Sequence, residues 1–125
     1  MSEPTIERAT VTVGVAHLAL ALLTVIDRAG YGGRPEGVLG TAAEHPAWAS
    51  IHLAIGLLVL ASVATQKLRT PTLCLSFGAL GCWSTFMWLW AIRLEPDETW
   101  AGAFLGFALA GVSFALSGLW ADREV

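Results

Sequence analysis

Charged residues are scarce in this 125-residue chain. Only 14% of the residues are Asp, Glu, Lys or Arg, whereas a typical soluble domain has about 25%. Four long stretches contain none of them: Ala9 to Ile26, Ala47 to Thr65, Thr72 to Ile92 and Thr99 to Ala121. The polar segments between these stretches are short, so the composition excludes a separate soluble domain.

Each uncharged stretch is also strongly apolar, and 55% of the whole chain is hydrophobic. A helix of about 17–25 apolar residues, at about 1.5 Å per residue, matches the hydrocarbon thickness of a membrane. The sequence therefore predicts an all-α integral membrane protein with a single four-pass transmembrane domain over residues 1–125. We expect an up-down four-helix transmembrane bundle with helices at 9–26, 47–65, 72–92 and 99–121.

Basic residues are not in excess. The formal net charge is −3 and the isoelectric point is near 5.5, so no basic surface attracts phosphate and nucleic acid is not an expected partner. The expected partners are the lipid bilayer, further copies of the chain and other membrane proteins. Asn is absent and Lys occurs once against six Arg, a bias typical of GC-rich codons that favours a prokaryotic or viral origin.

The apolar stretches lack the groups that membrane enzymes and coupled transporters need. Coupled ion transport usually requires a buried carboxylate or a paired charge within the membrane, and the predicted helices have neither. Catalysis requires a nucleophile, a base and oxyanion donors that converge on a substrate. No acidic residue lies at the depth of Ser84 and Thr85 to orient a histidine, so we expect no enzyme and assign no catalytic residue.

Cysteine is also rare. Cys74 and Cys82 are eight residues apart on one predicted helix, a spacing that cannot close a disulfide and does not match a metal knuckle. We expect both to be small packing residues.

Two histidines fall inside the predicted helices, where ionisable groups are costly. His17 lies midway along the first helix, and His52 lies about one and a half turns into the second. Counted from the ends that these helices share, the two differ in depth by about 6 Å, an offset that disfavours joint ligation of a haem iron. We expect neutral imidazoles bonded to backbone or hydroxyl groups; the alternatives are haem, or a proton-responsive or metal-binding pair joined by His45.

Tryptophan positions mark the predicted helix ends. Five of the six indoles lie near a predicted membrane interface, where such rings are favoured: Trp48, Trp88, Trp90, Trp100 and Trp120. Trp83 falls near the middle of the third helix instead. It either fills the bundle core or lines a pore or pocket with His17, His52 and Ser84.

Small residues recur where helices could pack closely. Gly102, Gly106 and Ala110 repeat every fourth residue on the last helix, and Gly78 and Gly81 lie on the third. Close backbone approach through such residues supplies much of the association energy of helices in lipid. The pattern predicts a packing seam, but it leaves open whether the seam joins helices of one chain or copies of the chain in an oligomer.

The connection 27–46 carries five Gly and two Pro. Connections of this length are usually functional or disordered, so we expect either a mobile outer tether or a lid or partner-binding loop. Four basic residues lie on the side of both termini and three on the other side, and Lys67 and Arg69 share one short turn. The positive-inside rule therefore predicts cytoplasmic termini.

Together these features favour a small non-enzymatic membrane protein that self-associates and alters membrane permeability, like a holin or a channel. The alternative is an accessory or structural subunit that packs against a larger membrane complex through its third and fourth helices. A third hypothesis is haem or metal binding through His17 and His52; no other cofactor is expected.

Overall fold

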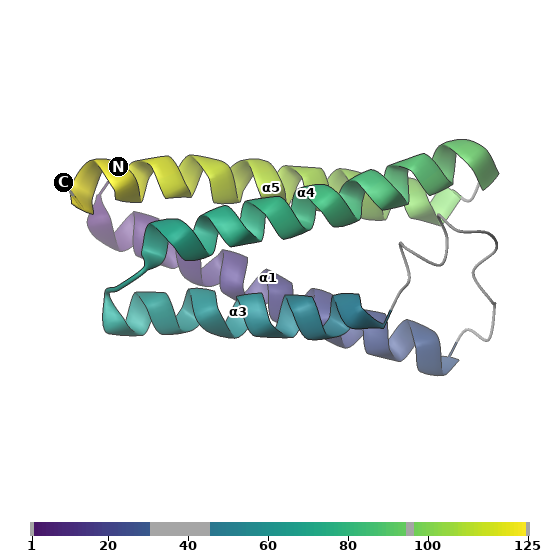
Figure 1. The fold of residues 1–125 in the computed structure, drawn as a ribbon, viewed down its shortest axis with the longest axis horizontal. Helices are drawn as coiled ribbons and strands as arrows, with labels where there is room; N and C mark the ends of the chain where they lie inside the picture. Colours follow the sequence, from purple (N-terminus) through teal and green to yellow (C-terminus); the bar gives the residue numbers. More distant parts are fainter. Residues whose placement is uncertain (1, 31–45, 95–96, 125) are drawn as a thin grey trace.

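The described part of the chain is entirely helical, as predicted. The computed structural model describes the backbone of residues 2–30, 46–94 and 97–124, with side chains except at 27–30, 90, 91, 93, 94, 97–101 and 124. The helices are α1 (Glu3–Gly30), α3 (Ala47–Thr65), α4 (Arg69–Leu94) and α5 (Asp97–Glu124). They lie lengthwise beside one another, and both chain ends lie at the same end as the α3–α4 turn (Figure 1).

Three helices are longer than predicted. α1 begins at Glu3 because the Ser2 carbonyl accepts hydrogen bonds from the N–H groups of Thr5 (3.1 Å) and Ile6 (3.2 Å). Pro4 does not prevent this start, since a helix needs no N–H donor in its first turn. Pro71 occupies the first turn of α4 in the same way. Several polar residues that were expected in loops are therefore helical.

The turn between α3 and α4 is correspondingly tighter than the predicted segment 66–71. Gln66 (φ 56°) and Leu68 (φ 58°) both adopt left-handed backbone conformations, which non-glycine residues adopt rarely. The Gln66 N–H donates to the Val63 carbonyl at 3.3 Å and so caps the last turn of α3. At the other connection, residues 31–45, including most of the predicted outer loop and His45, lie outside the described residues.

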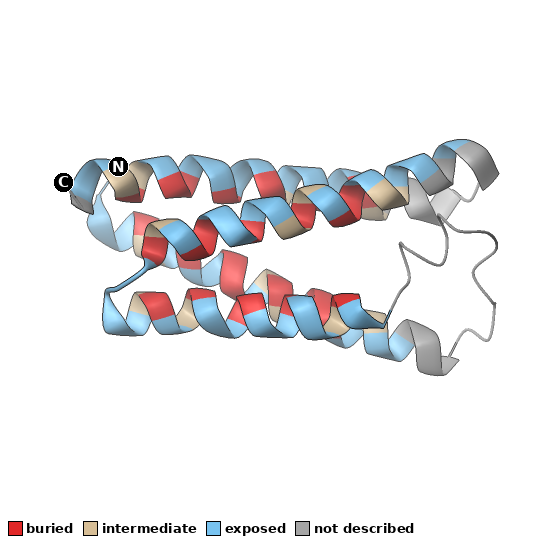
Figure 2. Ribbon diagram, viewed as in Figure 1, coloured by how far each residue is buried: buried red, intermediate tan, exposed pale blue. Residues whose placement is uncertain are grey.

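All four helices are long and apolar enough to cross a membrane. The qualifying segments are Glu3–Ile26, Ala47–Thr65, Arg69–Leu89 and Gly102–Arg123, and only a third of each is buried inside the molecule. The outward faces carry large apolar side chains that are more than half exposed, among them Leu22, Leu57, Leu75, Phe104 and Phe114. In the view of Figure 2, exposed residues lie along the outward sides of α3 and α5.

Buried residues recur at intervals of three and four on each helix, the spacing of left-handed helical packing. The repeating inward positions are Ile6, Thr10, Val13, His17 and Leu20 on α1; Trp48, His52, Ile55, Val59 and Ser62 on α3; Arg69, Leu73, Ser76, Leu80 and Trp83 on α4; and Ala103, Gly106, Ala110, Ser113, Ser117 and Trp120 on α5. Many of these residues are polar. The bundle therefore has a partly polar interior and an apolar exterior.

The helices form two closely packed pairs, α1 with α3 and α4 with α5, which touch each other less extensively. Gly14 and Gly56 allow the first pair to approach: a Cβ on Gly56 would lie 3.0 Å from the Gly14 carbonyl oxygen and 2.8 Å from a Leu18 methyl carbon. Gly106 does the same for the second pair, because a Cβ there would overlap the Ser84 hydroxyl. Small residues thus set the spacing within each pair.

Candidate functional site

A chain of hydrogen bonds between side chains crosses the interior and takes one residue from each helix. His52 of α3 and His17 of α1 bring their Nδ1 atoms within 2.9 Å of each other. His17 Nε2 lies 2.7 Å from Ser76 Oγ of α4, and Ser76 Oγ lies 2.9 Å from Ser113 Oγ of α5. We call these four residues the interior chain. The chain ends where Ser113 Oγ donates to the Leu109 carbonyl at 2.9 Å.

The interior chain is fully enclosed by the bundle. His17 is 1% exposed and the other three members are 0% exposed. Each member occupies an inward position of its helix, one or two turns from apolar neighbours such as Val13 and Leu80. Hydrogen bonds in such a low-dielectric setting are stronger than in water, and a member without a partner costs more. The four helices are therefore tied together at one level by polar contacts.

Aromatic rings surround His52. Its ring packs edge-on against Trp83 at 5.5 Å between centroids, and Trp48 lies at 6.0 Å. Trp48 also contacts Phe86 across α3 and α4, at 6.4 Å. Within the described residues, His52 Nε2 and Ser84 Oγ, next to Trp83 on α4, are buried polar atoms with no hydrogen-bond partner. The interior chain therefore ends at an imidazole nitrogen that is enclosed by aromatic groups.

The direct contact of His17 with His52 corrects the depth offset expected from the sequence. The offset assumed that α1 and α3 end at one level, but α1 reaches beyond the start of α3 (Figure 1). The contact also does not suit joint metal or haem ligation. Two nitrogens that bind one ion at about 2.0–2.1 Å each lie further apart than 2.9 Å in tetrahedral or linear geometry, and His17 Nε2 already has Ser76 as its partner. In the described part of the chain, no group of three His, Cys, Asp or Glu residues could hold a metal.

Ser76 and His17 also lie as close as a nucleophile and its general base. The sequence suggested Ser84 and Thr85 as the hydroxyls to consider for this role, not Ser76. However, Ser76 is 0% exposed, and its oxygen is held on the other side by Ser113. A substrate carbon cannot approach that oxygen without separation of the helices.

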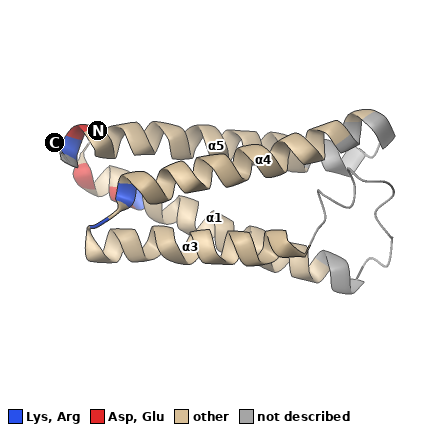
Figure 3. Ribbon diagram, viewed as in Figure 1, with Lys and Arg blue, Asp and Glu red and all other residues tan. Residues whose placement is uncertain are grey.

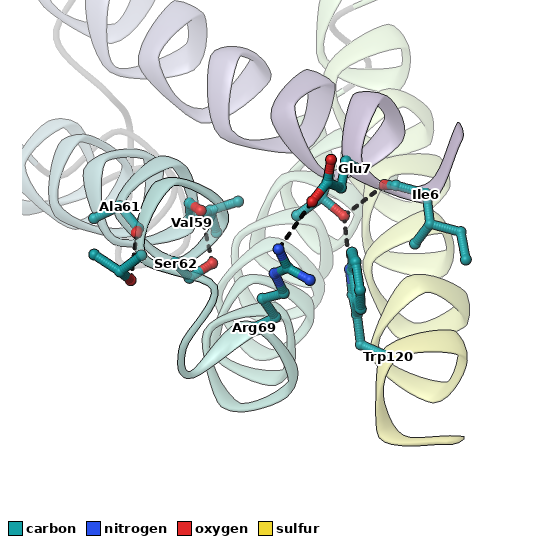
Figure 4. Close-up of polar contacts among 9 residues, drawn as sticks. Ile6, Glu7, Val59, Ala61, Ser62, Arg69 and Trp120 are labelled. Atoms are coloured by element: carbon teal, nitrogen blue, oxygen red, sulfur yellow. Dashed lines mark hydrogen bonds and ion pairs between the residues drawn. The ribbon is translucent and has the colours of Figure 1, made fainter. Parts of the chain in front are cut away.

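A second polar cluster lies at the end of the bundle that holds the chain termini. Arg69 of α4 pairs with Glu7 of α1 at 2.9 Å, and its guanidinium carbon lies 3.9 Å from the centre of the Trp120 ring. The Trp120 indole N–H donates to Thr10 Oγ1 at 3.0 Å, and Figure 4 shows these groups converging from three helices. The Arg69 side chain is 6% exposed and that of Glu7 is 34% exposed, so the pair is buried on its Arg69 side and reaches the surface at Glu7.

The Glu7–Arg69 pair corrects the expectation that the helices contain no paired charge. Both residues were expected in segments outside the spans, but the earlier starts of α1 and α4 bring them into helices. The described charged residues gather at this end, and the middle of the bundle has none (Figure 3). Next to this cluster, Thr72 Oγ1 donates to Ser62 Oγ at 3.2 Å and ties α4 to α3.

The predicted packing seam divides into two groups. Gly106 and Ala110 are buried, and Gly102 faces Met87 of α4, because a Cβ on Gly102 would lie 3.1 Å from the Met87 methyl carbon. These residues of α5 pack against α4 of the same chain. Among the described residues, no other group lies within 4 Å of where a Cβ on Gly78 or Gly81 would lie, so neither is at a contact between the described helices.

The tryptophans also divide into two groups. Trp88 is 42% exposed on the outside of α4, as an interfacial residue would be, whereas Trp48 and Trp120 are turned into the bundle. Trp120 is inward because Thr10 accepts its N–H and Arg69 covers its ring. The side chains of Trp90 and Trp100 lie outside the described residues. Trp83 is buried against His52, the position that the sequence left open between core and pocket.

Ser76, Ser113, Thr10 and the burial of Arg69 were not predicted from the sequence. A signal for them exists: Thr10 and His17 are seven residues apart, as are Arg69 and Ser76, and Ser113 and Trp120. Residues separated by seven lie on the same face of a helix. Comparison with known proteins finds no matching family model, no matching curated protein and no matching solved structure.

Proposed function

We propose that the chain is a small, non-enzymatic membrane protein that crosses the bilayer four times as an up-down bundle and alters its permeability, as a channel-like or holin-like protein does. The observation that carries the proposal is an apolar exterior around a partly polar interior. The exposed faces are apolar along all four helices, while the buried faces carry His, Ser, Thr and Arg. A water-soluble protein rarely exposes so large an apolar surface.

Lipid around the helices explains that distribution. Apolar side chains are stable against hydrocarbon, and interhelical hydrogen bonds and small residues hold helices together there. The described charges lie at the end that includes both termini and the α3–α4 turn, where they would meet headgroups and water. Lys67 and Arg69 at this end support cytoplasmic termini.

The interior supports a role in permeability because polar groups recur along its length. From the charged end, Arg69, Thr72 and Ser76 follow one another at single turns of α4, and Ser84 lies further on. Polar residues inside a membrane bundle are costly and usually mark a pathway or relay. The residues that would line such a pathway are enclosed within one chain, so a pore between copies is not required for it.

Expression of the chain alone in a bacterium tests this proposal. A permeabilising protein lowers the membrane potential, measured with a potential-sensitive dye, and the interior variant Ser76→Ala reduces the effect. The matched variant Thr85→Val should act like the native chain, because Thr85 is exposed and its hydroxyl donates to the Gly81 carbonyl of its own helix. An unchanged potential at full expression of inserted protein would count against the proposal.

A second candidate is an accessory subunit of a larger membrane complex. It is favoured by the outer faces of α4 and α5. There Gly78, Gly111 and Gly118 are exposed, and in the described part of the chain no group lies within 4 Å of where a Cβ on them would lie. These positions could receive helices of another protein or of a second copy. The subunit hypothesis predicts an intact membrane potential and a second protein in stoichiometric amount after mild detergent extraction; self-association predicts the chain alone at a multiple of its mass.

A further inference from the structure

The direction of each hydrogen bond in the interior chain can be assigned from its Ser113 end. Ser113 has one hydroxyl proton, which it donates to the Leu109 carbonyl, so Ser113 Oγ must accept from Ser76. Ser76 has then used its own proton and accepts from His17 Nε2–H. A neutral His17 protonated on Nε2 is an acceptor at Nδ1, so His52 Nδ1–H is the donor between the two rings.

This assignment leaves one lone pair without a partner, at His52 Nε2. That atom is also the buried imidazole nitrogen that lacks a hydrogen bond in the described residues. A bare imidazole nitrogen is a base that can take a proton. The geometry of the chain and the unpaired atom, found separately, thus point to the same end.

The reverse assignment keeps every bond between the four side chains and gives up the bond from Ser113 to the Leu109 carbonyl. If Ser113 donates to Ser76, then Ser76 donates to His17 Nε2, His17 Nδ1–H donates to His52 Nδ1, and His52 Nε2 carries a proton. Every bond between the four side chains survives, since each member both donates and accepts in either direction. The two states differ in which partner of each link carries the proton. They also differ at the two ends, where His52 Nε2 is either bare or protonated and Ser113 donates either to Leu109 or to Ser76.

We infer that the species moved by this protein is the proton, relayed by the interior chain with His52 Nε2 as one terminal and Ser113 Oγ as the other. The inference rests on the proposed function and names its permeant. A proton that binds His52 Nε2 releases the Nδ1 proton to His17 Nδ1. His17 then gives its Nε2 proton to Ser76, Ser76 gives its hydroxyl proton to Ser113, and the original Ser113 proton passes to water that enters from the charged end. One proton enters, one leaves, and no electron is transferred.

From the two terminals, α3 and α5 lead towards opposite ends of the bundle: α3 back to its start at Ala47, and α5 on to Trp120 at the charged end. His52 is about one and a half turns from the start of α3 at Ala47. From Ser113 and Ser76, the next hydroxyls towards the charged end are Ser117 and Thr72, each one turn away at about 6 Å of helix rise. Beyond them lies Glu7, a partly exposed carboxylate that faces Arg69. Water at that end can receive a proton from this side.

Other permeants fit this interior less well. A metal cation must replace its hydration shell with several oxygen ligands, whereas the level of the interior chain offers two hydroxyls and two imidazoles. An anion needs a positive partner, and in the described side chains Arg69 is the buried cation, already paired with Glu7. No Asp, Glu, Lys or Arg is buried beside the histidines in the described parts of α1, α3, α4 and α5. Groups that donate and accept at once suit a proton.

The test uses the full chain reconstituted into vesicles of phosphatidylcholine and phosphatidylglycerol. An internal pH dye reports proton flux driven by a valinomycin-induced potassium potential, and separate arms measure chloride flux and release of a trapped fluorescent solute. The variants are His17→Gln and Ser76→Ala, with Thr85→Val as the matched control. Gln retains a hydrogen-bond donor and an acceptor near the positions of the ring nitrogens but cannot relay a proton. The unfolding temperature of His17→Gln is therefore measured as well, because a variant that has lost only the relay should be as stable as the native chain.

We expect proton flux in vesicles that contain the native chain or Thr85→Val. In both interior variants the proton flux should fall to that of protein-free vesicles, while the unfolding temperature of His17→Gln should equal that of the native chain. Proton flux that is unchanged in His17→Gln would overturn the relay. Chloride or solute flux in the native chain that His17→Gln does not reduce would also overturn it. Each of these two results would leave the permeability proposal in place. Vesicles that pass none of these species would overturn both.

Discussion

His17 and His52 share a hydrogen bond between like atoms, Nδ1 to Nδ1, at 2.9 Å. One ring must therefore be protonated at Nδ1 and the other bare there. Because His17 Nε2 is held by Ser76, the state of this pair is linked to α4 and, through Ser113, to α5. A single contact between α1 and α3 thus depends on all four helices.

The histidine pair should contribute measurably to stability. We expect His17→Phe to lower the free energy of unfolding by about 1–3 kcal/mol, since His52 Nδ1 and Ser76 Oγ lose a buried partner. In a double-mutant cycle with His52→Phe, the coupling should be about 0.6 kcal/mol and no more than about 1.7 kcal/mol, the range found for interhelical hydrogen bonds in membranes. Detergent unfolding followed by circular dichroism measures both. Strictly additive effects would show that the rings do not interact.

Gly106 should tolerate no side chain, whereas Gly111 should. A Cβ on Gly106 would overlap Ser84 Oγ and lie 3.1 Å from a Trp83 ring carbon, while a Cβ on Gly111 would meet no described group within 4 Å. Gly106→Ala should therefore cost about 1–3 kcal/mol of unfolding free energy as an overpacked site. Gly111→Ala, on the exposed face of the same helix, should be neutral or slightly stabilising.

Removal of the Ser84 side chain provides the check on this cause. In the double variant Gly106→Ala with Ser84→Gly, the overlap with the hydroxyl is gone, and part of the lost thermal stability should return. Equal destabilisation by Gly106→Ala and Gly111→Ala would mean that α5 does not approach α4 through Gly106.

Substitution of one partner of the Glu7–Arg69 pair should destabilise the protein more than substitution of both partners. Glu7→Gln leaves the buried Arg69 charge without its partner. We expect a loss below the about 3–5 kcal/mol typical of fully buried pairs, because the Glu7 side chain is 34% exposed. Glu7→Gln with Arg69→Met removes the unpaired charge and should recover stability relative to Glu7→Gln alone, measured by thermal unfolding. A double variant less stable than the single would contradict the account.

The outer face of α4 should be inaccessible to water in a membrane. Cys82 is exposed on the isolated bundle, so lipid has to cover it if the helices span. In intact vesicles, a charged maleimide should label Asp122→Cys, at the exposed charged end, but should leave Cys82 unlabelled until detergent is added at denaturing strength. Equal labelling of both sites in intact vesicles would contradict membrane insertion.

The number and positions of the helices could be predicted well from the sequence, but the contacts inside the bundle could not. Absence of charge over long apolar stretches is decisive for helix number, since length and apolar character decide whether a segment can span a bilayer. The helix ends were missed at Pro4 and Pro71, because proline in a first turn looks like a break but is compatible with a helix. Those errors placed Glu7 and Arg69 in loops and concealed the ion pair.

The interior chain could not be predicted because it depends on the relative register of helices. The spacing of Thr10 and His17, or of Arg69 and Ser76, indicates which residues share a face. It does not indicate that α1 reaches past the start of α3, which sets His17 opposite His52. Likewise, Gly106 and Ala110 predicted a seam, but only the position of Ser84 and Trp83 shows that α4 of the same chain fills it.

Nitrogen NMR of the two histidines in lipid tests the central claim most directly. Whichever way the interior chain is oriented, the shared Nδ1–H···Nδ1 bond requires opposite tautomers in the two rings, with His17 on Nε2 and His52 on Nδ1 in the orientation derived from Ser113. We predict one ring of each tautomer and a coupling across the hydrogen bond between the two Nδ1 nuclei. Identical tautomers in both rings, with no coupling between them, would contradict the account.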